Sequence, residues 1–491
     1  MIKLKKTTLA IGLPVICGSA LWLFSATPEA RYVVWPILAI VNIGVWFWLV
    51  LWNRDGVFPL FDLGSVCMAA NVAYILIPLL GFVLSGLIFT SLSDLRLQFY
   101  SPSSKELGTF AWHYVVYVAS FASVYLFVRG RASIRGLGFR PPDGRTIGAF
   151  VILAVFLSGV LTLVQAIYGF DLSPSYDSAL YESYDVLQRL PLVVRQFVSR
   201  SQDALVIIRL GLLIILVANW RVRRWRYVLI LLLSTSVLGY LFKMGARTEL
   251  VVLFLGTGLL YHRLVRPLRV TVIVMAGIGV LVTAMVFGMM RGGTDIEGNV
   301  GNLRSLVSSY GTGELFSIAN EFQTVFGGSY DLYQMKNAGA VQSVPWQVYA
   351  TEILMLAPQQ LLPFEKVLVQ SWYLETSEVP SYFMYGPVSQ AVLGLSWVEL
   401  VLRGAILACV FGKVHRWYVR RAAGFQATLF YLWMTVWSYY TIRASTFYFV
   451  TLLVYGYIPT LVCVYLMREL LRVDHKEGEA SVELAIAARP T

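Results

Sequence analysis

Charged residues are scarce in this chain of 491 residues. They make up 13% of it, whereas apolar residues make up 58%, and the mean hydropathy is +0.68. A water-soluble protein of this length needs more polar surface than such a composition supplies. The scarcity of charge therefore excludes a soluble globular protein and indicates that lipid surrounds much of the chain.

Cysteine and histidine are also rare, and their positions favour neither a metal site nor a disulfide framework. The four cysteines lie in apolar stretches without the close pairing that either kind of site needs, so we expect them to pack between helices. The four histidines are scattered, and we expect each to be interfacial or solvent-facing. These histidines are His113, His262, His415 and His475. No metal and no other cofactor is predicted.

Sequence motifs of soluble enzymes are missing as well. The chain has no glycine-rich phosphate loop ending in Lys-Ser or Lys-Thr, no His-Glu-x-x-His and no Gly-x-Ser-x-Gly. An ATP-driven or metallohydrolase role is therefore disfavoured. The net charge of +12 comes from arginines in short runs between apolar segments, so nucleic acid is not a predicted partner.

Long apolar segments recur along the whole chain. Most reach the roughly 20 residues that a helix needs to cross the hydrocarbon of a bilayer. The segments are 7–26, 32–52, 63–90, 109–128, 146–168, 204–220, 227–242, 248–262, 269–289, 388–412, 424–442 and 446–467. They predict an all-α, polytopic membrane bundle of about twelve transmembrane helices. Two segments, 227–242 and 248–262, are short enough to form one re-entrant hairpin instead.

The charges between these segments predict their orientation. With the amino terminus inside, the inward short segments hold 20 cationic residues and the longer outward segments hold nine. This bias follows the positive-inside rule and predicts a bacterial inner-membrane protein with both termini in the cytoplasm. The segment 7–26 also resembles a signal peptide, but its removal would invert the charge pattern, so we expect it to be retained.

This topology divides the chain into four segments. Helices one to nine occupy 1–289, a large periplasmic loop occupies 290–387, helices ten to twelve occupy 388–470, and a cytoplasmic tail occupies 471–491. The large loop has apolar and aromatic residues throughout, so it should fold. We expect interfacial helices at Gly313–Phe326 and Trp346–Leu356. A second outer loop, 169–203, is also long enough to cover a site.

Several cations break the positive-inside pattern by lying on the predicted outer side. An arginine within a membrane segment costs about 2.5–3.5 kcal/mol on insertion scales, so several at one depth suggest a function. The planar fork of arginine suits phosphate, and these cations can converge on an anionic ligand. They are Lys243, Arg247, Arg291, Arg443, Arg209 and Arg403. Alternatively, each pairs with a nearby carboxylate or extends to the headgroups, as Glu399 allows for Arg403.

The run Gly245-Ala246-Arg247-Thr248-Glu249 resembles the Gly-Ser-Arg-Gly type of segment in Wzy-type O-antigen polymerases. The long loop is similar to theirs too, with Gly327–Tyr330, Leu361–Pro363, Pro380 and Gly386–Ser389 preceding Ser396–Glu399 and Arg403-Gly404. The resemblance covers roughly 245–412. One departure is Arg403, because the family more often carries an uncharged residue before this glycine.

The resemblance implies a membrane glycosyltransferase that moves a growing glycan from undecaprenyl diphosphate onto another lipid-linked repeat unit. Such oligosaccharides would be donor and acceptor, membrane lipids would surround the protein, and a chain-length regulator protein could join them. The reaction needs cations for the departing diphosphate and a base, or an orienting acceptor, for the attacking hydroxyl. Arg247, Arg291 and Arg443 are our candidates for the first task, and Glu314, then Glu321, for the second.

Aromatic side chains of the loop can stack on sugar rings or anchor the loop at the membrane interface. They are Tyr310, Tyr330, Trp346, Trp372 and Tyr385. Two other functions stay open. A flippase or transporter of the same lipid-linked sugar should have two similar halves and short loops, which this chain lacks. An O-antigen ligase uses the same donor, and the sequence separates it poorly from a polymerase.

Overall fold

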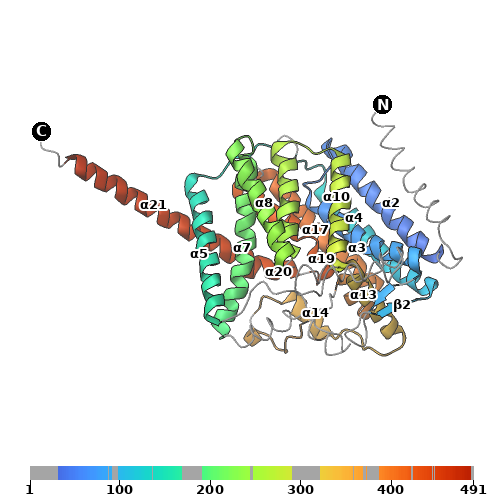
Figure 1. The fold of residues 1–491 in the computed structure, drawn as a ribbon. Helices are drawn as coiled ribbons and strands as arrows, with labels where there is room; N and C mark the ends of the chain where they lie inside the picture. Colours follow the sequence, from blue (N-terminus) through green and yellow to red (C-terminus); the bar gives the residue numbers. More distant parts are fainter. Residues whose placement is uncertain are drawn as a thin grey trace. The chain divides into compact units, whose positions relative to one another are not determined.

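The structure is a computed structural model, and it is predominantly helical (Figure 1). It describes residues 31–86, 88–90, 98–134, 137–168, 191–243, 247–289, 321–357, 359–368, 372, 386–421, 424–444, 446 and 448–487. The strands β1 (Ile88–Thr90) and β2 (Gln98–Tyr100) form one antiparallel pair, with Phe89 opposite Phe99.

Six helices within the described ranges are long and apolar enough to cross a membrane. The spans are Tyr32–Asp55, Leu63–Ser85, Ser104–Arg129, Gly144–Tyr168, Leu192–Ala218 and Phe449–Arg472. Two shorter apolar helices run over Val252–Val265 and Val270–Gly279. Each overlaps a predicted segment, so the prediction of a helical membrane protein is confirmed in this coarse form. The predicted segment 7–26 lies outside the described residues.

The helices follow the predicted segments in the first half of the chain. They are α2 (Arg31–Asp55), α3 (Leu63–Ser85), α4 (Ser104–Arg129), α5 (Gly144–Tyr168), α7 (Leu192–Ala218), α8 (Arg223–Lys243), α9 (Arg247–Leu260) and α10 (Val270–Met289). α9 continues into a π-helical turn, Tyr261–Val265. The expected loop 169–203 is too long, because α7 already begins at Leu192; residues 169–190 lie outside the described part.

The second half departs more from expectation. Its helices are α13 (Glu321–Asn337), α14 (Trp346–Ile353), α16 (Pro387–Leu393), α17 (Trp397–Arg421), α18 (Phe425–Trp437), α19 (Tyr440–Arg443), α20 (Tyr448–Leu452) and α21 (Ile458–Ala487). The expectation of one continuous helix over 388–412 was wrong. The chain turns between α16 and α17, where Ser396 adopts a φ of 55°. Segment 424–442 likewise divides into α18 and α19.

Two α-helices and a short 3-10 helix, Gln359–Leu361, occupy the described part of the predicted outer loop. α14 matches the expected helix at Trp346–Leu356, although it ends at Ile353. α13 overlaps only the end of the expected helix Gly313–Phe326 and runs on to Asn337. Residues 313–320 lie outside the described part.

The chain divides into two compact units, each assembled from separate stretches. Unit 1 comprises 1–136, 267–420 and 437–449, and unit 2 comprises 137–266, 421–436 and 450–491. These units cut across the four linear segments predicted from the sequence. In unit 2, α5 and α9 both pack on α7, and α21 packs on α5.

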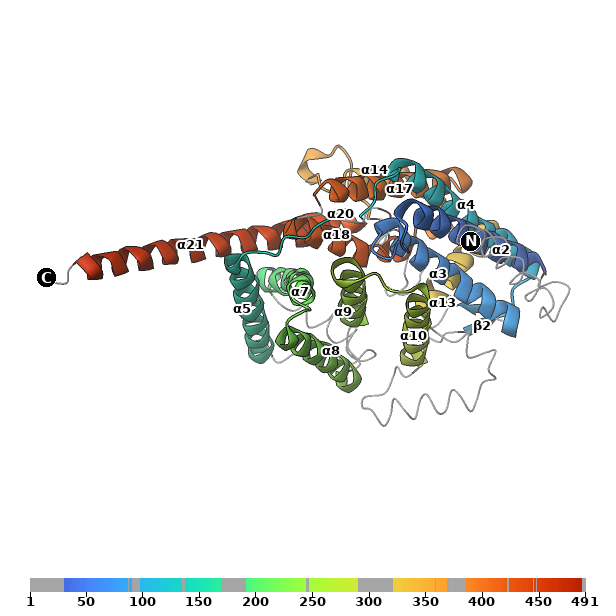
Figure 2. The ribbon, with the colours of Figure 1, turned by 90° about the horizontal axis from the view of Figure 1, so that it is seen from above.

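In unit 1, α2 lies beside α4 in both views (Figures 1 and 2). α17 runs parallel to α4, since Trp397 stacks on His113 and Gly412 approaches Val128 farther along. Gly404, Ala408 and Gly412 recur every fourth residue, a pattern that lets membrane helices approach closely. A Cβ on Gly404 would lie 2.8 Å from the Tyr117 carbonyl oxygen. This close approach positions the polar groups at both ends of α17.

Candidate functional site

Unit 1 holds two buried polar clusters at opposite ends of α17. The Arg403 cluster consists of Arg403, Glu352, Glu399, Tyr349 and Thr446, and lies near the start of α17. The other, the Asp62 cluster, contains His415, twelve residues later in the helix. Twelve residues correspond to about 18 Å of helix axis. The two clusters therefore lie at different depths of the packed helices.

Arg403 binds two carboxylates that come from different parts of the chain. Its Nε donates to Glu399 Oε1 at 2.7 Å, one helical turn earlier in α17. Its Nη1 and Nη2 donate to the two carboxylate oxygens of Glu352, in α14, at 3.0 and 2.8 Å. Nη1 also donates to Thr446 Oγ1 at 3.0 Å. Arg403 thus attaches a helix of the predicted outer loop to a long helix of unit 1.

These contacts bear on the diphosphate-binding role predicted for Arg403. An arginine side chain has five N–H donors, and four hydrogen bonds of Arg403 already go to protein oxygens. The side chains of Arg403, Glu352 and Glu399 are all buried. The geometry therefore does not fit direct phosphate binding by Arg403, and it agrees with the alternative in which Glu399 is its partner.

Lys336 and Tyr349 extend this arrangement. Lys336, near the end of α13, donates through Nζ to the carbonyl oxygens of Val392 and Gly394, at the carboxyl end of α16. A cation suits this position because carbonyl groups are left unpaired there. Burial lowers the pKa of Lys336, and the nearby Glu399 partly offsets that effect. Tyr349 donates to Glu399 Oε2 at 2.8 Å.

Arg443 ends the short helix α19, three residues before Thr446 of the Arg403 cluster. Its side chain is buried, and its guanidinium carbon lies 5.0 Å from the ring centroid of Tyr440 and 5.7 Å from that of Tyr439. α19 packs against α16 and α3. Of the predicted diphosphate ligands whose side chains the structure describes, Arg403 and Arg443 are thus brought into one region of unit 1.

The other predicted cations and carboxylates are less completely described. Arg209 lies half-buried in α7 of unit 2, where it has a partner of its own. Lys243 ends α8, Arg247 begins α9 and Glu321 begins α13, but their side chains are not described. Arg291 and Glu314 lie outside the described residues. Their predicted roles stay predictions.

The predicted glycan-binding aromatics differ in exposure. Tyr330 is completely buried against Phe110, with ring centroids 5.4 Å apart, so its ring has no open face for a sugar. Trp372 is partly buried against the cluster of Leu332, Val341, Val348 and Leu393. Trp346, at the start of α14, is 60% exposed and is the described aromatic that best fits stacking. Tyr310 and Tyr385 lie outside the described residues.

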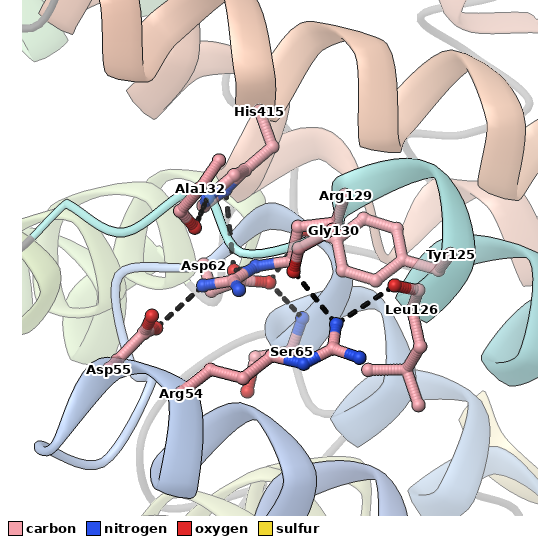
Figure 3. Close-up of polar contacts among 10 residues, drawn as sticks. All are labelled: Arg54, Asp55, Asp62, Ser65, Tyr125, Leu126, Arg129, Gly130, Ala132 and His415. Carbon is pink, nitrogen blue, oxygen red and sulfur yellow. Dashed lines mark hydrogen bonds and ion pairs between the residues drawn. The ribbon is translucent and has the colours of Figure 1, made fainter.

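The Asp62 cluster joins α2, α3, α4 and α17 (Figure 3). Asp62 caps α3 by accepting from Ser65 N at 3.1 Å, and it also accepts from Tyr125 Oη at 2.7 Å. Arg129 donates to Asp62 Oδ2 at 2.8 Å and to Asp55 Oδ2 at 2.6 Å. These buried ion pairs fix the ends of three helices relative to one another.

His415 completes the cluster, with Nδ1 3.3 Å from Asp62 Oδ2 and Nε2 3.3 Å from the Ala132 carbonyl oxygen. It is fully buried, and His113 and His262 are buried too, so the expectation of interfacial or solvent-facing side chains was wrong for these three histidines. It lies beyond the predicted span 388–412. Burial lowers its pKa to about 4, because the lost hydration outweighs the attraction of Asp62. His415 is therefore neutral at pH 7.

The pKa of Asp62 shifts below its ordinary value. Burial alone would raise it, but in the acid range, where His415 becomes protonated, the charges of His415 and Arg129 reverse the direction, together with hydrogen bonds from Tyr125 and Arg129. Asp62 is therefore ionised, held between Arg129 and the neutral imidazole. Asp62 is 1% exposed, and this arrangement stabilises the packing of the helices.

Sequence reasoning missed Glu352, Lys336 and Asp62. Glu352 and Lys336 contact residues more than fifty positions away, which no local pattern indicates. Asp55 and Asp62 carried a weak signal, because two carboxylates flank a short connection between apolar segments in a chain poor in charge. No group of three or more potential metal ligands gathers in the part of the chain that the structure describes. No family model, curated protein or solved structure matches this chain.

Proposed function

We propose that the protein is a polymerase of lipid-linked oligosaccharides with about twelve transmembrane helices and a site at the periplasmic face of a bacterial inner membrane. One observation carries the proposal: a helix of the long loop, α14, is held by a buried bidentate ion pair to α17. A loop attached in this way can form a wall of a site. A flexible linker would not need such a contact.

A second arginine at the same end of unit 1, Arg443, supports a diphosphate ligand. Arg443 lies close in sequence to Thr446, which Arg403 binds, and its helix packs against α16. Because Arg403 is committed to two carboxylates, we assign it to holding the loop in place. We assign the diphosphate to Arg443, with Arg247 and Arg291 as further candidates from the sequence. Arginine forms paired charge-assisted hydrogen bonds with phosphate oxygens.

The proposed reaction is a nucleophilic substitution at the donor sugar. A hydroxyl oxygen of the acceptor glycan attacks the anomeric carbon of the donor and forms the new glycosidic bond. The bond from that carbon to the diphosphate breaks, and undecaprenyl diphosphate leaves with the electron pair. The hydroxyl proton passes to a base, for which Glu314 and Glu321 are the candidates. Cations stabilise the departing charge, so no nucleotide is needed.

Gene deletion tests this proposal through the lipopolysaccharide banding pattern on an electrophoretic gel. A polymerase mutant should keep single repeat units on the lipid A core and lose all longer chains. Loss of the single-repeat form as well would point to a ligase or a flippase. An unchanged distribution of chain lengths would contradict the proposal.

A further inference from the structure

A cavity of about 380 Å³ opens near the Asp62 end of unit 1, between the end of α4 and the last turns of α17. Four arginines line it, together with apolar side chains. The lining includes Arg129, Arg131, Arg416, Arg420, Phe127 and Val419. The volume falls in the range of about 300–1,000 Å³ that is typical of small-molecule sites.

The positive charge of this cavity is not balanced by nearby carboxylates. Arg129 already forms ion pairs with Asp55 and Asp62, the two carboxylates of the Asp62 cluster. Arg131 and Arg416 are exposed, and so is Arg420; within the described ranges none of the three forms an ion pair. Like charges held together in this way repel one another, so an anion that enters the cavity gains from all of them.

Arg129 has a buried guanidinium group that is incompletely hydrogen-bonded. Its side chain is 1% exposed, yet its Nη1 has no hydrogen-bond partner among the described atoms. A buried donor without a partner costs free energy unless a ligand or water satisfies it. Arg129 also lines the cavity, and the positive charge of its buried guanidinium adds to the attraction on an anion placed there.

The apolar part of the lining identifies the source of the anion. Phe127, in the last turn of α4, is 86% exposed, and Val419 lies beside the cations on α17. α4 is long and apolar enough to cross a membrane, so its end lies where headgroups meet acyl chains. A lipid places its phosphate beside the arginines and its acyl chains beside Phe127. Free phosphate would leave the apolar surface uncovered.

We propose that this cavity binds the phosphate headgroup of an anionic phospholipid. The guanidinium groups of Arg131, Arg416 and Arg420 contact the phosphate oxygens, and the apolar rim contacts the acyl chains. Basic pockets between membrane helices are suited to such headgroups. The site is independent of the proposed polymerase reaction, because it lies at the other end of α17 from the Arg403 cluster.

Native mass spectrometry of the purified full chain in detergent tests the site. The protein is titrated with phosphatidylglycerol, phosphatidylcholine or inorganic phosphate. We expect at least a tenfold preference for phosphatidylglycerol over phosphatidylcholine. The triple variant R131Q/R416Q/R420Q should lose about tenfold or more of its affinity for phosphatidylglycerol, since each surface cation contributes to anionic-lipid binding.

The matched control is R221Q/R223Q/R224Q, which removes the same charge from another exposed arginine run. It should retain the affinity for phosphatidylglycerol within twofold. Equal losses in the two triple variants would overturn the site in favour of general surface charge, as would wild-type affinity in R131Q/R416Q/R420Q. Displacement of the lipid by an equal concentration of inorganic phosphate would overturn the lipid as ligand. If the triple variant does not purify, the single variant R416Q, at an exposed position, is titrated in its place. A loss of affinity for phosphatidylglycerol supports the site, and wild-type affinity overturns it.

Discussion

Replacing Arg403 by alanine should destabilise the protein strongly, because this side chain joins α14 to α17. The substitution removes three charge-assisted contacts to Glu352 and Glu399 and one hydrogen bond to Thr446. It also leaves two buried carboxylates beside each other without a cation. Removal of one partner from a buried ion pair costs about 3–5 kcal/mol, and we expect a loss of stability in that range.

The reference for this loss is an exposed ion pair in the same chain. Arg468 lies 3.1 Å from Asp143, and both side chains are more than one-third exposed. Because solvent screens such a pair, Arg468→Ala should cost only about 0–1 kcal/mol. Glu352→Gln should fall between the two variants, since it leaves the pair of Arg403 and Glu399 intact.

Titration of the purified variants with a denaturing detergent gives the difference in the free energy of unfolding. Circular dichroism follows the helix content during the titration. If Arg403→Ala were no more destabilising than Arg468→Ala, the Arg403 cluster would not hold the loop helix, and the main support for the proposed function would be lost.

Three further predictions concern other parts of the molecule. The pKa of His415 is about 4 in the folded protein and 6.5 in the unfolded chain. The free energy of unfolding should therefore be highest above pH 6.5 and fall by roughly 3 kcal/mol as the pH drops to 4. His415→Gln should flatten this dependence in thermal unfolding measured across that range. Gly404→Leu should cost about 1–3 kcal/mol in detergent unfolding, because the side chain would force α17 away from α4; unchanged stability would show that the helices do not touch there. Arg247→Ala should yield a folded protein that fails to restore long chains in a deletion strain, and full complementation would remove Arg247 from the site.

Hydropathy predicted the positions of the long helices well, because a span needs a minimum length of apolar residues whatever its neighbours are. It failed where a helix is interrupted without a loss of hydropathy. The break between α16 and α17 falls at Gly394–Ser396, inside a segment that stays apolar. The break between α18 and α19 also falls inside an apolar segment, 424–442. Hydropathy is averaged over a window of side chains and contains no information on backbone angles, so it does not detect a local turn.

The contacts of the two polar clusters were also predictable from the sequence only in part. The pair of Glu399 and Arg403 was visible in the sequence, because residues four apart share one face of a helix. Glu352 was not visible, since its contact depends on how the loop folds back. His415 was misplaced for the same reason: Asp62 and Ala132 surround it, and both are distant in sequence. Contacts between distant segments decide which charges are paired, and a single sequence carries little information on them.

Reconstitution tests the central claim most directly. The purified protein is placed in liposomes with one chemically defined undecaprenyl-diphosphate-linked repeat unit, and the products are measured by mass spectrometry. The proposed function predicts lipid-linked chains of two, three and more repeats, released undecaprenyl diphosphate in equal number to the new bonds, and loss of both products in Arg443→Ala. A folded wild-type protein that leaves the repeat unit unchanged would contradict the account.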